Sequence, residues 1–302
     1  MPQASAPLSL RERAEDRAHE LAFVWRSRQF RKDNGYRRPP RPVTVLAYPD
    51  RITRHPHILL AKLCAALGYP VTSDPARPFD IAVAYHDRTF TDPEVLAPIP
   101  DGVPVINGRC LDISKVRVDR EVEAVFSVRT LLDPTRHAGP MVEKSDENAA
   151  EGRRIVEGPM EPRDGFVYQR LIDTTEPDGH YTEHRVAVHD GRVPLVYRKR
   201  IREADRFSKV AASVDVVEAE DDFSADELDG ILEVCRRMGL DFGEVDVLRD
   251  RESGVPVPID VNRTPLAALR YLTPDDRRQA IGTLAASFQT MCEDRLRDSA
   301  VR

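Results

Sequence analysis

The sequence predicts a protein of mixed α/β and α+β class, in which an N-terminal helix and a small open α/β domain precede a larger α+β part. Short apolar segments that alternate with a helix between 43 and 106 are typical of buried parallel strands. Beyond residue 112, turn dipeptides separate segments of alternating apolar and polar residues, which indicates antiparallel hairpins. We therefore expect a helix and linker over 1–42, the α/β domain over 43–110 and a larger module over 111–302.

The charge balance and the cysteine spacing exclude several classes of protein. Charged residues make up 32% of the chain, but they carry both signs and leave a net charge of only −6. This balance argues against general nucleic-acid binding and against attachment to an acidic membrane surface. No apolar run reaches the length of about 18 residues that a transmembrane helix needs. The four cysteines are widely spaced without a CxxC pair, and we expect buried thiols in a cytoplasmic protein.

The first elements follow from apolar periodicity. Segment 9–31 is predicted to be a charged amphipathic helix, and a linker rich in proline and arginine follows it over 36–42. A second helix is predicted over 55–67, with Gly68 as its C-cap. The strands of the α/β domain are expected over 43–48, 80–85 and 103–106.

The larger module is predicted to contain two hairpins and three helices. One hairpin, over 184–200, is centred on the turn dipeptide Asp190-Gly191. The other pairs 242–249 with 255–262. Single strands are expected over 141–144 and 166–172, a polar loop over 145–152, and helices over 114–127, 225–238 and 275–297.

Acidic residues on one face of the second hairpin suggest a cation site. Because side chains alternate along a strand, a turn near Ser253 places Asp246 roughly opposite Asp260, and Glu244 near Asn262, within about two residues of register. Opposed carboxylates repel each other, so a cation is expected between them, and Mg²⁺ typically takes one or two carboxylates plus phosphate oxygens. An exposed polar face neutralised by nearby arginines is the alternative. The opposite, apolar face is predicted to hold Val245, Val247, Ile259 and Val261.

Basic residues elsewhere in the module are candidates for binding an anion. Pairing about Asp190-Gly191 brings Glu183 near Arg198 and places Arg185 on the same face. Two such arginines could clamp a phosphate or a carboxylate, or the pair Glu183–Arg198 could be an ordinary surface ion pair. Lys115 opens a helix and Lys144 ends a strand beside the polar loop. Each lysine could contact phosphates or simply be solvated.

The order of these parts resembles the ATP-grasp superfamily over about 112–265, which is about half of the chain. A lysine, a strand ending in a second lysine and a loop, an apolar strand, an arginine hairpin and Asp…Asp-x-Asn before Pro265 follow one another in the family's order. The piece DVNRTP is the most specific, because it is similar to the family's acidic-x-Asn metal motif. The resemblance implies an ATP-grasp fold with a small lobe over about 111–172 and a larger lobe over about 173–302, preceded by the α/β domain.

The resemblance also implies a role for each candidate residue. Loop 145–152 would close over the ATP phosphates, and the two arginines would hold the γ-phosphate or the transferring group. The residues concerned are Lys115 and Lys144 for the phosphates, Tyr168, Gln169, Arg170 and Leu171 for adenine, Arg185 and Arg198 for the transferred group, and Asp246, Asp260 and Asn262 for one or two Mg²⁺ ions.

Two departures from the family pattern stand out. Asp260 occupies a position where glutamate is more usual, and its side chain reaches less far. The loop after Lys144 contains a single glycine, Gly152, where the family's loops are often glycine-rich.

The function implied is that of an ATP- and Mg-dependent ligase, which joins a carboxylate to an amine through an acylphosphate. We expect a small-molecule or peptide substrate and no nucleic-acid or membrane partner. The charged N-terminal helix could mediate a homodimer. Two alternatives stay open: an ATP-dependent phosphotransferase acting on a hydroxyl, and a non-catalytic ATP-grasp-like binding or scaffold protein.

Overall fold

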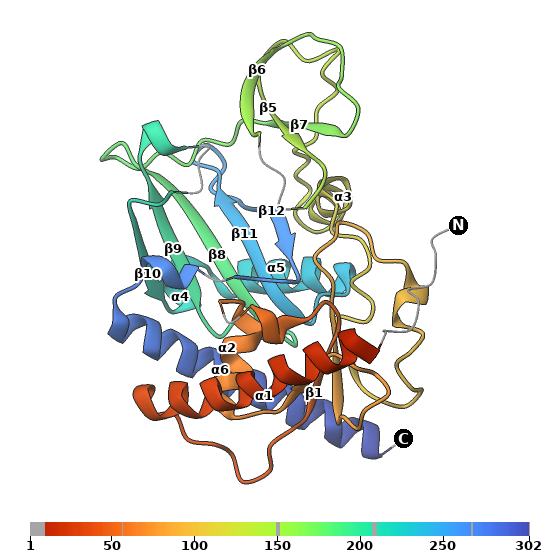
Figure 1. Cartoon of the computed structure of the whole chain (residues 1–302). Helices are drawn as coiled ribbons and strands as arrows, with labels where there is room; N and C mark the ends of the chain where they lie inside the picture. The colour runs from red at the N-terminus through yellow and green to blue at the C-terminus, as the bar shows by residue number, and fades with distance from the viewer. Residues whose placement is uncertain (1–9, 56, 149–151, 207–209, 267, 302) are drawn as a thin grey trace. The chain divides into compact units, whose positions relative to one another are not determined.

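The computed structural model describes residues 10–55, 57–148, 152–206, 210–266 and 268–301. The chain divides into two compact units, most of whose helices and strands are labelled in Figure 1. The first unit comprises Met1–Asp87, Thr91–Leu111 and Arg263–Arg302, and the second comprises Arg88–Phe90 and Asp112–Asn262.

The first unit is built on a four-stranded parallel sheet with the strand order β2-β1-β3-β4. The strands are β1 (Val45–Pro49), β2 (Val71–Thr72), β3 (Ile81–Tyr85) and β4 (Val105–Ile106). The helices are α1 (Leu10–Asn34), α2 (Leu59–Leu67) and α6 (Pro274–Ala300), with short 3₁₀ turns at Ile52–Arg54, Pro93–Leu96 and Ala268–Tyr271. Helix α2 is almost wholly buried because it packs against both α1 and α6.

The second unit contains two antiparallel sheets. The larger has the strand order β10-β9-β8-β11-β12, and the smaller has the order β6-β5-β7. The larger sheet consists of β8 (Tyr181–His189), β9 (Val196–Ile201), β10 (Ser213–Val217), β11 (Phe242–Arg249) and β12 (Pro256–Asn262). The smaller consists of β5 (Gly139–Ser145), β6 (Arg154–Gly158) and β7 (Phe166–Arg170).

Two helices of the second unit, α3 and α5, begin at side-chain caps. Ser224 accepts a hydrogen bond from the backbone of Glu227, whose side chain bonds back to the Ser224 backbone, so that α5 begins with a capping box. At the start of α3, the Ser114 side chain accepts a hydrogen bond from the backbone N–H of Arg117. Helix α3 packs against α5 and β12. The helices are α3 (Lys115–Phe126), α4 (Ala219–Asp222) and α5 (Ala225–Met238), with a 3₁₀ turn at Glu203–Asp205.

The predicted class is confirmed, and the differences concern segments whose partners are distant in sequence. We expected the C-terminal helix within the module 111–302, whereas α6 groups with the first unit through its contacts with α2. The helix predicted over 55–67 begins only at Leu59, after a 3₁₀ turn. Strands β6 and β10, which lie at sheet edges, were not predicted.

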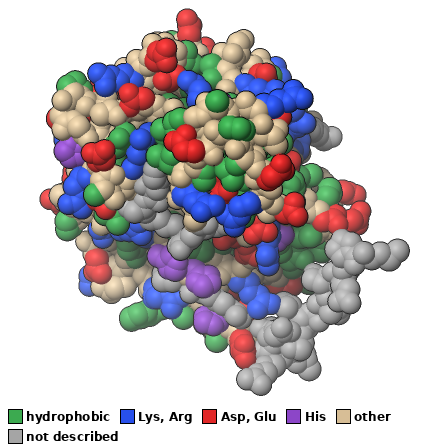
Figure 2. Space-filling view, turned by 90° about the horizontal axis from the view of Figure 1, so that it is seen from above, with side chains coloured by type: hydrophobic (Ala, Val, Ile, Leu, Met, Phe, Trp, Pro, Cys, Tyr) green, Lys and Arg blue, Asp and Glu red, His purple; other side chains and the backbone are tan. Residues whose placement is uncertain are grey.

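The surface matches the mixed charge of the sequence. Basic and acidic side chains are intermingled over the face seen in Figure 2. None of the helices in the described part of the chain combines the length and the apolar character needed to cross a membrane.

Candidate active site

The acidic pair lies on one face of the larger sheet of the second unit, in the predicted register. Asp246 on β11 is directly opposite Asp260 on β12, and Glu244 is directly opposite Asn262. Because directly opposed residues share a face, these four side chains define what we call the site face of the sheet. Gly243 allows the close pairing of the strands, since a Cβ there would lie 2.5 Å from the backbone oxygen of Asn262.

One residue of this hairpin departs from the prediction. The register shifts after Asp246, so that Val247 pairs with Pro258 rather than with Ile259. Ile259 was predicted to face the apolar core opposite the acidic pair, but as the extra residue of this bulge it lines a pocket with Leu248. The bulge therefore places an apolar side chain of the pocket wall next to Asp260 in the sequence.

Strand β8 adds a cation to the acidic pair. Arg185 lies opposite Asp246, and its Nε and Nη2 atoms donate to the two carboxylate oxygens at 2.7 and 2.8 Å. Lys199 Nζ lies 3.6 Å from the same carboxylate. Burial alone would raise the pKa of Asp246, but Arg185 and Lys199 outweigh it and hold the pKa well below its ordinary value. Asp246 is therefore ionised and already paired.

Asp260 has no such partner. It makes neither a hydrogen bond nor an ion pair within 4 Å with any residue that the structure describes. Burial raises the pKa of Asp260, and Asp246 adds to the rise against the opposing effects of Lys115 and Lys144. The pair thus consists of one satisfied carboxylate and one carboxylate that lacks a counter-ion in contact.

The two predicted lysines lie within electrostatic reach of Asp260. Lys144, at the end of β5, is buried, and burial lowers its pKa to about 8. Lys115 opens α3, where its Nζ donates to the carbonyl of Glu147 at 3.2 Å. The predicted closing loop 145–152 includes 149–151, which lie outside the described residues.

The prediction that Arg198 joins Arg185 is wrong. In the β8–β9 pairing Arg198 lies opposite His184, and Lys199 lies opposite Glu183. The connection runs from Asp190 to Leu195 rather than through two residues, and a shift of one position moves a side chain to the other face. Arg198 therefore lies on the opposite face of the sheet, where its Nε atom donates a hydrogen bond to Asp222 at 2.9 Å.

Lys199 takes the place on the site face that was assigned to Arg198. Its Nζ atom donates to Glu183, in addition to its contact with Asp246. Sequence reasoning missed Lys199 because only the length of the β8–β9 connection decides which residue of the run YRKR faces the site.

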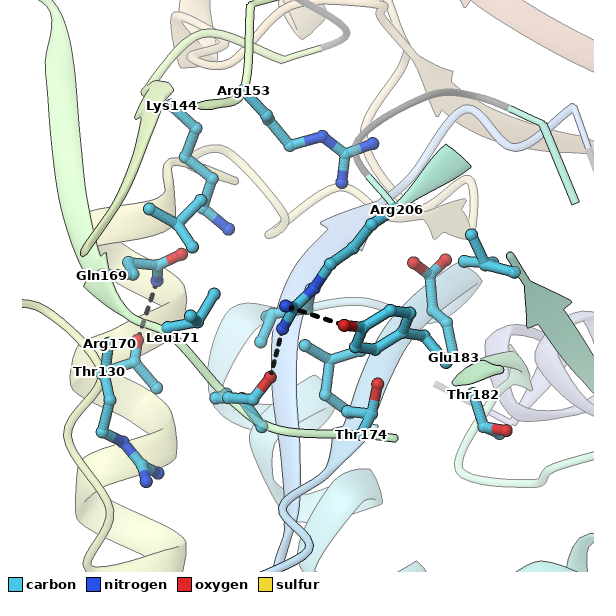
Figure 3. Close-up of a pocket in the computed structure, with 16 residues that line it drawn as sticks. Thr130, Lys144, Arg153, Gln169, Arg170, Leu171, Thr174, Thr182, Glu183 and Arg206 are labelled. Atoms are coloured by element: carbon cyan, nitrogen blue, oxygen red, sulfur yellow. Dashed lines mark hydrogen bonds between the residues drawn. The ribbon is translucent and has the colours of Figure 1, made fainter. Parts of the chain in front are cut away.

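A pocket adjoins these residues within the second unit (Figure 3). Its wall includes Gln169, Arg170 and Leu171 of the predicted adenine segment, together with Lys144. Figure 3 shows Lys144 and Arg153 toward one end and Arg206 in the middle. The remaining lining residues come from the segment between α3 and β5, from β5, β8, β9, β11 and β12, and from the segment after β7: Thr130, Val142, Ile172, Thr174, Tyr181, Thr182, Glu183, Ile201, Leu248 and Ile259.

Two side chains of this region, Tyr168 and Arg206, differ from the prediction: one was expected in the pocket and is not there, and the other was not expected. Tyr168 does not line the pocket, because its hydroxyl donates to Glu143 at 3.0 Å inside the smaller sheet. Arg206, which sequence reasoning missed, lies 4.1 Å over the Tyr181 ring and donates to the carbonyl of Ile172 at 3.2 Å. Its guanidinium is therefore hydrogen-bonded to a backbone carbonyl of the pocket wall.

Glu244 is the most unusual residue of the site face. Its side chain is 1% exposed, and neither carboxylate oxygen has a hydrogen-bond partner among the residues that the structure describes. Burial raises the pKa of Glu244 to about 7, while Arg185 opposes the rise from 3.5 Å. Tyr197, opposite Arg185, has a buried hydroxyl that also lacks a partner.

Comparisons with known proteins bear on the fold. Neither a protein-family model nor a curated protein matches the sequence. Among solved structures, the ATP-grasp ligase PsnB in complex with a minimal precursor superposes with a TM-score of 0.53, at 14% identity over 82% of this chain and 99% of that one. The chain has the ATP-grasp fold.

Two further ATP-grasp neighbours agree. The D-cycloserine synthetase DcsG has a TM-score of 0.52 at 15% identity, over 81% of this chain and 99% of that one. The D-alanine–D-alanine ligase of Bacillus anthracis in complex with ATP has a TM-score of 0.52 at 15% identity, over 85% of this chain and 97% of that one. These likenesses confirm the fold that the sequence motifs predict.

Proposed function

We propose that this protein is an ATP- and Mg²⁺-dependent ligase that joins a carboxylate to an amine through an acylphosphate. The observation that carries the proposal is the opposed pair Asp246 and Asp260, which lies beside Lys115, Lys144 and a pocket in one unit of the fold. Acidic oxygens and cations in close proximity are what a metal–nucleotide complex requires. The neighbours that share the fold include ligases solved with ATP, or with Mg and ADP.

The residues present fit a magnesium ion. Asp260 makes no ion pair with any residue that the structure describes, Asp246 is directly opposite, and Asn262 lies on the same face. No group of three or more His, Cys, Asp and Glu side chains in the described residues could hold a metal by itself. This agrees with an ion that takes two carboxylates and completes its shell with phosphate and water. When bound, Mg²⁺ would neutralise charge on the phosphates.

The protein's own side chains would supply position and charge. Lys144 and Lys115 would bind the phosphates, and Arg185 with Lys199 would hold the group that is transferred. Leu248 and Ile259 would form apolar contacts with the base in the pocket. Phosphoryl transfer needs little covalent chemistry from the enzyme, because alignment and charge neutralisation lower the barrier. The acylphosphate would then be captured by the amine.

The product decides between this ligase and a phosphotransferase. We would incubate the chain with Mg·ATP, a pool of carboxylic acids and hydroxylamine, which converts an acylphosphate to a stable hydroxamate. The proposal expects ADP and a hydroxamate by mass spectrometry, and neither from the variant Asp260→Asn. A stable phosphoester in place of the hydroxamate would contradict the ligase, and no Mg-dependent binding of ATP or ADP would contradict any ATP-dependent activity.

The expected location and partners are also proposals. All four cysteines are buried and none forms a disulfide, which supports a cytoplasmic protein. The exposed side chains of Leu21 and Trp25 on α1 support a homodimer through this helix. Light scattering of the chain and of Trp25→Glu would test the dimer. The substrate is proposed to be a small molecule or a peptide.

A further inference from the structure

The buried carboxylate of Glu244 is not explained by the roles assigned so far. Both of its oxygens are shielded from solvent, and within the described part of the chain neither accepts a hydrogen bond. A buried acceptor without a donor destabilises a fold, and a charged acceptor does so more strongly. Its position opposite Asn262, two residues before Asp246, places it beside the candidate metal ligands rather than in a distant part of the core.

Arg185 is in contact with both Glu244 and Asp246. Its Nε and Nη2 atoms are bonded to Asp246 at 2.7 and 2.8 Å, while its Nη1 atom lies 3.5 Å from Glu244 Oε2. The guanidinium carries five N–H donors in a rigid plane, and it can therefore donate hydrogen bonds first to one carboxylate and then to another. In the metal-free protein Asp246 accepts both hydrogen bonds from Arg185, whereas Glu244 only lies near the guanidinium.

Binding of a cation changes which carboxylate is available to Arg185. This step rests on the proposed function, in which Asp246 becomes a ligand of Mg²⁺. The ion and the guanidinium then compete for the same two oxygens of Asp246. A largely buried guanidinium that loses its carboxylate without replacement is strongly unfavourable. Glu244 is already within a small displacement of Nη1.

We propose that Glu244 is a positioning residue, which receives the Arg185 guanidinium when a magnesium–nucleotide complex takes Asp246. The transfer replaces one arginine–carboxylate pair with another, so no charge is left unpaired. It keeps Arg185 on the site face, where its remaining donors are available to phosphate. It also accounts for a buried carboxylate that has no hydrogen bond in the metal-free protein.

A double-mutant cycle distinguishes this transfer from a simple charge effect. Binding of ADP would be measured by calorimetry, with Mg²⁺ and with EDTA, for the native chain, Glu244→Gln, Arg185→Gln and the double variant. The transfer predicts that Glu244→Gln weakens Mg·ADP binding about tenfold in the native background and less than about twofold when Arg185 is already replaced. ADP binding in EDTA should not change. An equal loss in both backgrounds, or no loss in the native one, would overturn the proposal.

The variant Glu244→Asp gives a second, independent measurement. It keeps the negative charge beside the metal site but withdraws the carboxylate from Arg185 by one methylene. The transfer predicts weaker Mg·ADP binding, whereas a pure charge effect predicts unchanged binding, which would contradict the proposal. If the native chain binds no ADP in the presence of Mg²⁺, the proposed function falls and this inference with it. If the native chain binds and the cycle is additive, only the inference falls.

Discussion

The two opposed aspartates should respond in opposite directions to the same substitution. Asp246→Asn replaces a carboxylate that accepts two charge-assisted hydrogen bonds from Arg185 and lies near Lys199. Breaking a buried pair from one side costs about 3–5 kcal/mol. Because Arg185 keeps a contact at 3.5 Å with Glu244, we expect the lower end, about 3 kcal/mol of destabilisation.

Asp260→Asn removes a carboxylate that has no hydrogen bond or ion pair in the described residues. The substitution removes a like-charge pair across two strands, for which about 0.2–1 kcal/mol is typical. We therefore expect a gain of about 0.5 kcal/mol in the free energy of unfolding of the metal-free protein. The same variant should lose the stabilisation that Mg·ADP gives to the native chain, because a ligand bound only by the folded state raises its stability.

Urea unfolding in EDTA, followed by circular dichroism, measures both differences. Repeating the titrations with Mg²⁺ and ADP measures the loss of ligand stabilisation. The linkage has a definite sign: the pKa of Asp260 is raised in the folded state, so its destabilising effect is present at neutral pH and disappears as the pH falls through that raised pKa. A destabilisation of more than about 1 kcal/mol by Asp260→Asn, or none by Asp246→Asn, would refute the assignment of partners.

Three further predictions test other parts of the site. Arg198→Ala should leave Mg·ADP affinity unchanged and cost about 1 kcal/mol of stability, whereas Lys199→Ala should weaken Mg·ADP binding about tenfold; calorimetry that shows the reverse would contradict the observed register. Because burial lowers the pKa of Lys144 to about 8, the ammonium is lost as the pH rises through 8, so Mg·ADP affinity should fall there. The variant Lys144→Arg should bind equally at pH 7 and 9, and a fall that persists in it would point to another group. Gly243→Ala places a Cβ 2.5 Å from the backbone oxygen of Asn262, so it should destabilise the fold and weaken Mg·ADP binding, and an unchanged melting temperature would show that the strands can separate without cost.

The class of the fold and the acidic pair could be predicted because both depend on local rules. Alternation along β11 and β12, with a turn centred near Ser253, is enough to place Asp246 opposite Asp260. The caps of α3 and α5 depend on residues three positions apart. Information of this kind lies within one short segment of the sequence.

The errors arose where a longer-range quantity decides the outcome. The length of the β8–β9 connection determines whether Arg198 or Lys199 faces the site, and Asp190-Gly191 alone does not reveal it. The partner of α6 depends on α2, more than 200 residues earlier in the sequence. Nothing in the sequence marks the bulge at Ile259, because its neighbours alternate as a regular strand would.

The bulge gives β12 a property that a regular strand lacks. In the proposed function, two successive side chains, Ile259 and Asp260, would serve the two chemically different ends of one elongated ligand, the apolar base and the anionic tail. Deleting Ile259 would leave the carboxylates opposed but would remove the apolar wall against which the base would rest. A one-residue deletion should therefore lower the affinity for the base without lowering the affinity for the cation. The connection from Asp250 to Val255 carries no such constraint, and changes of length during evolution or engineering should accumulate there instead.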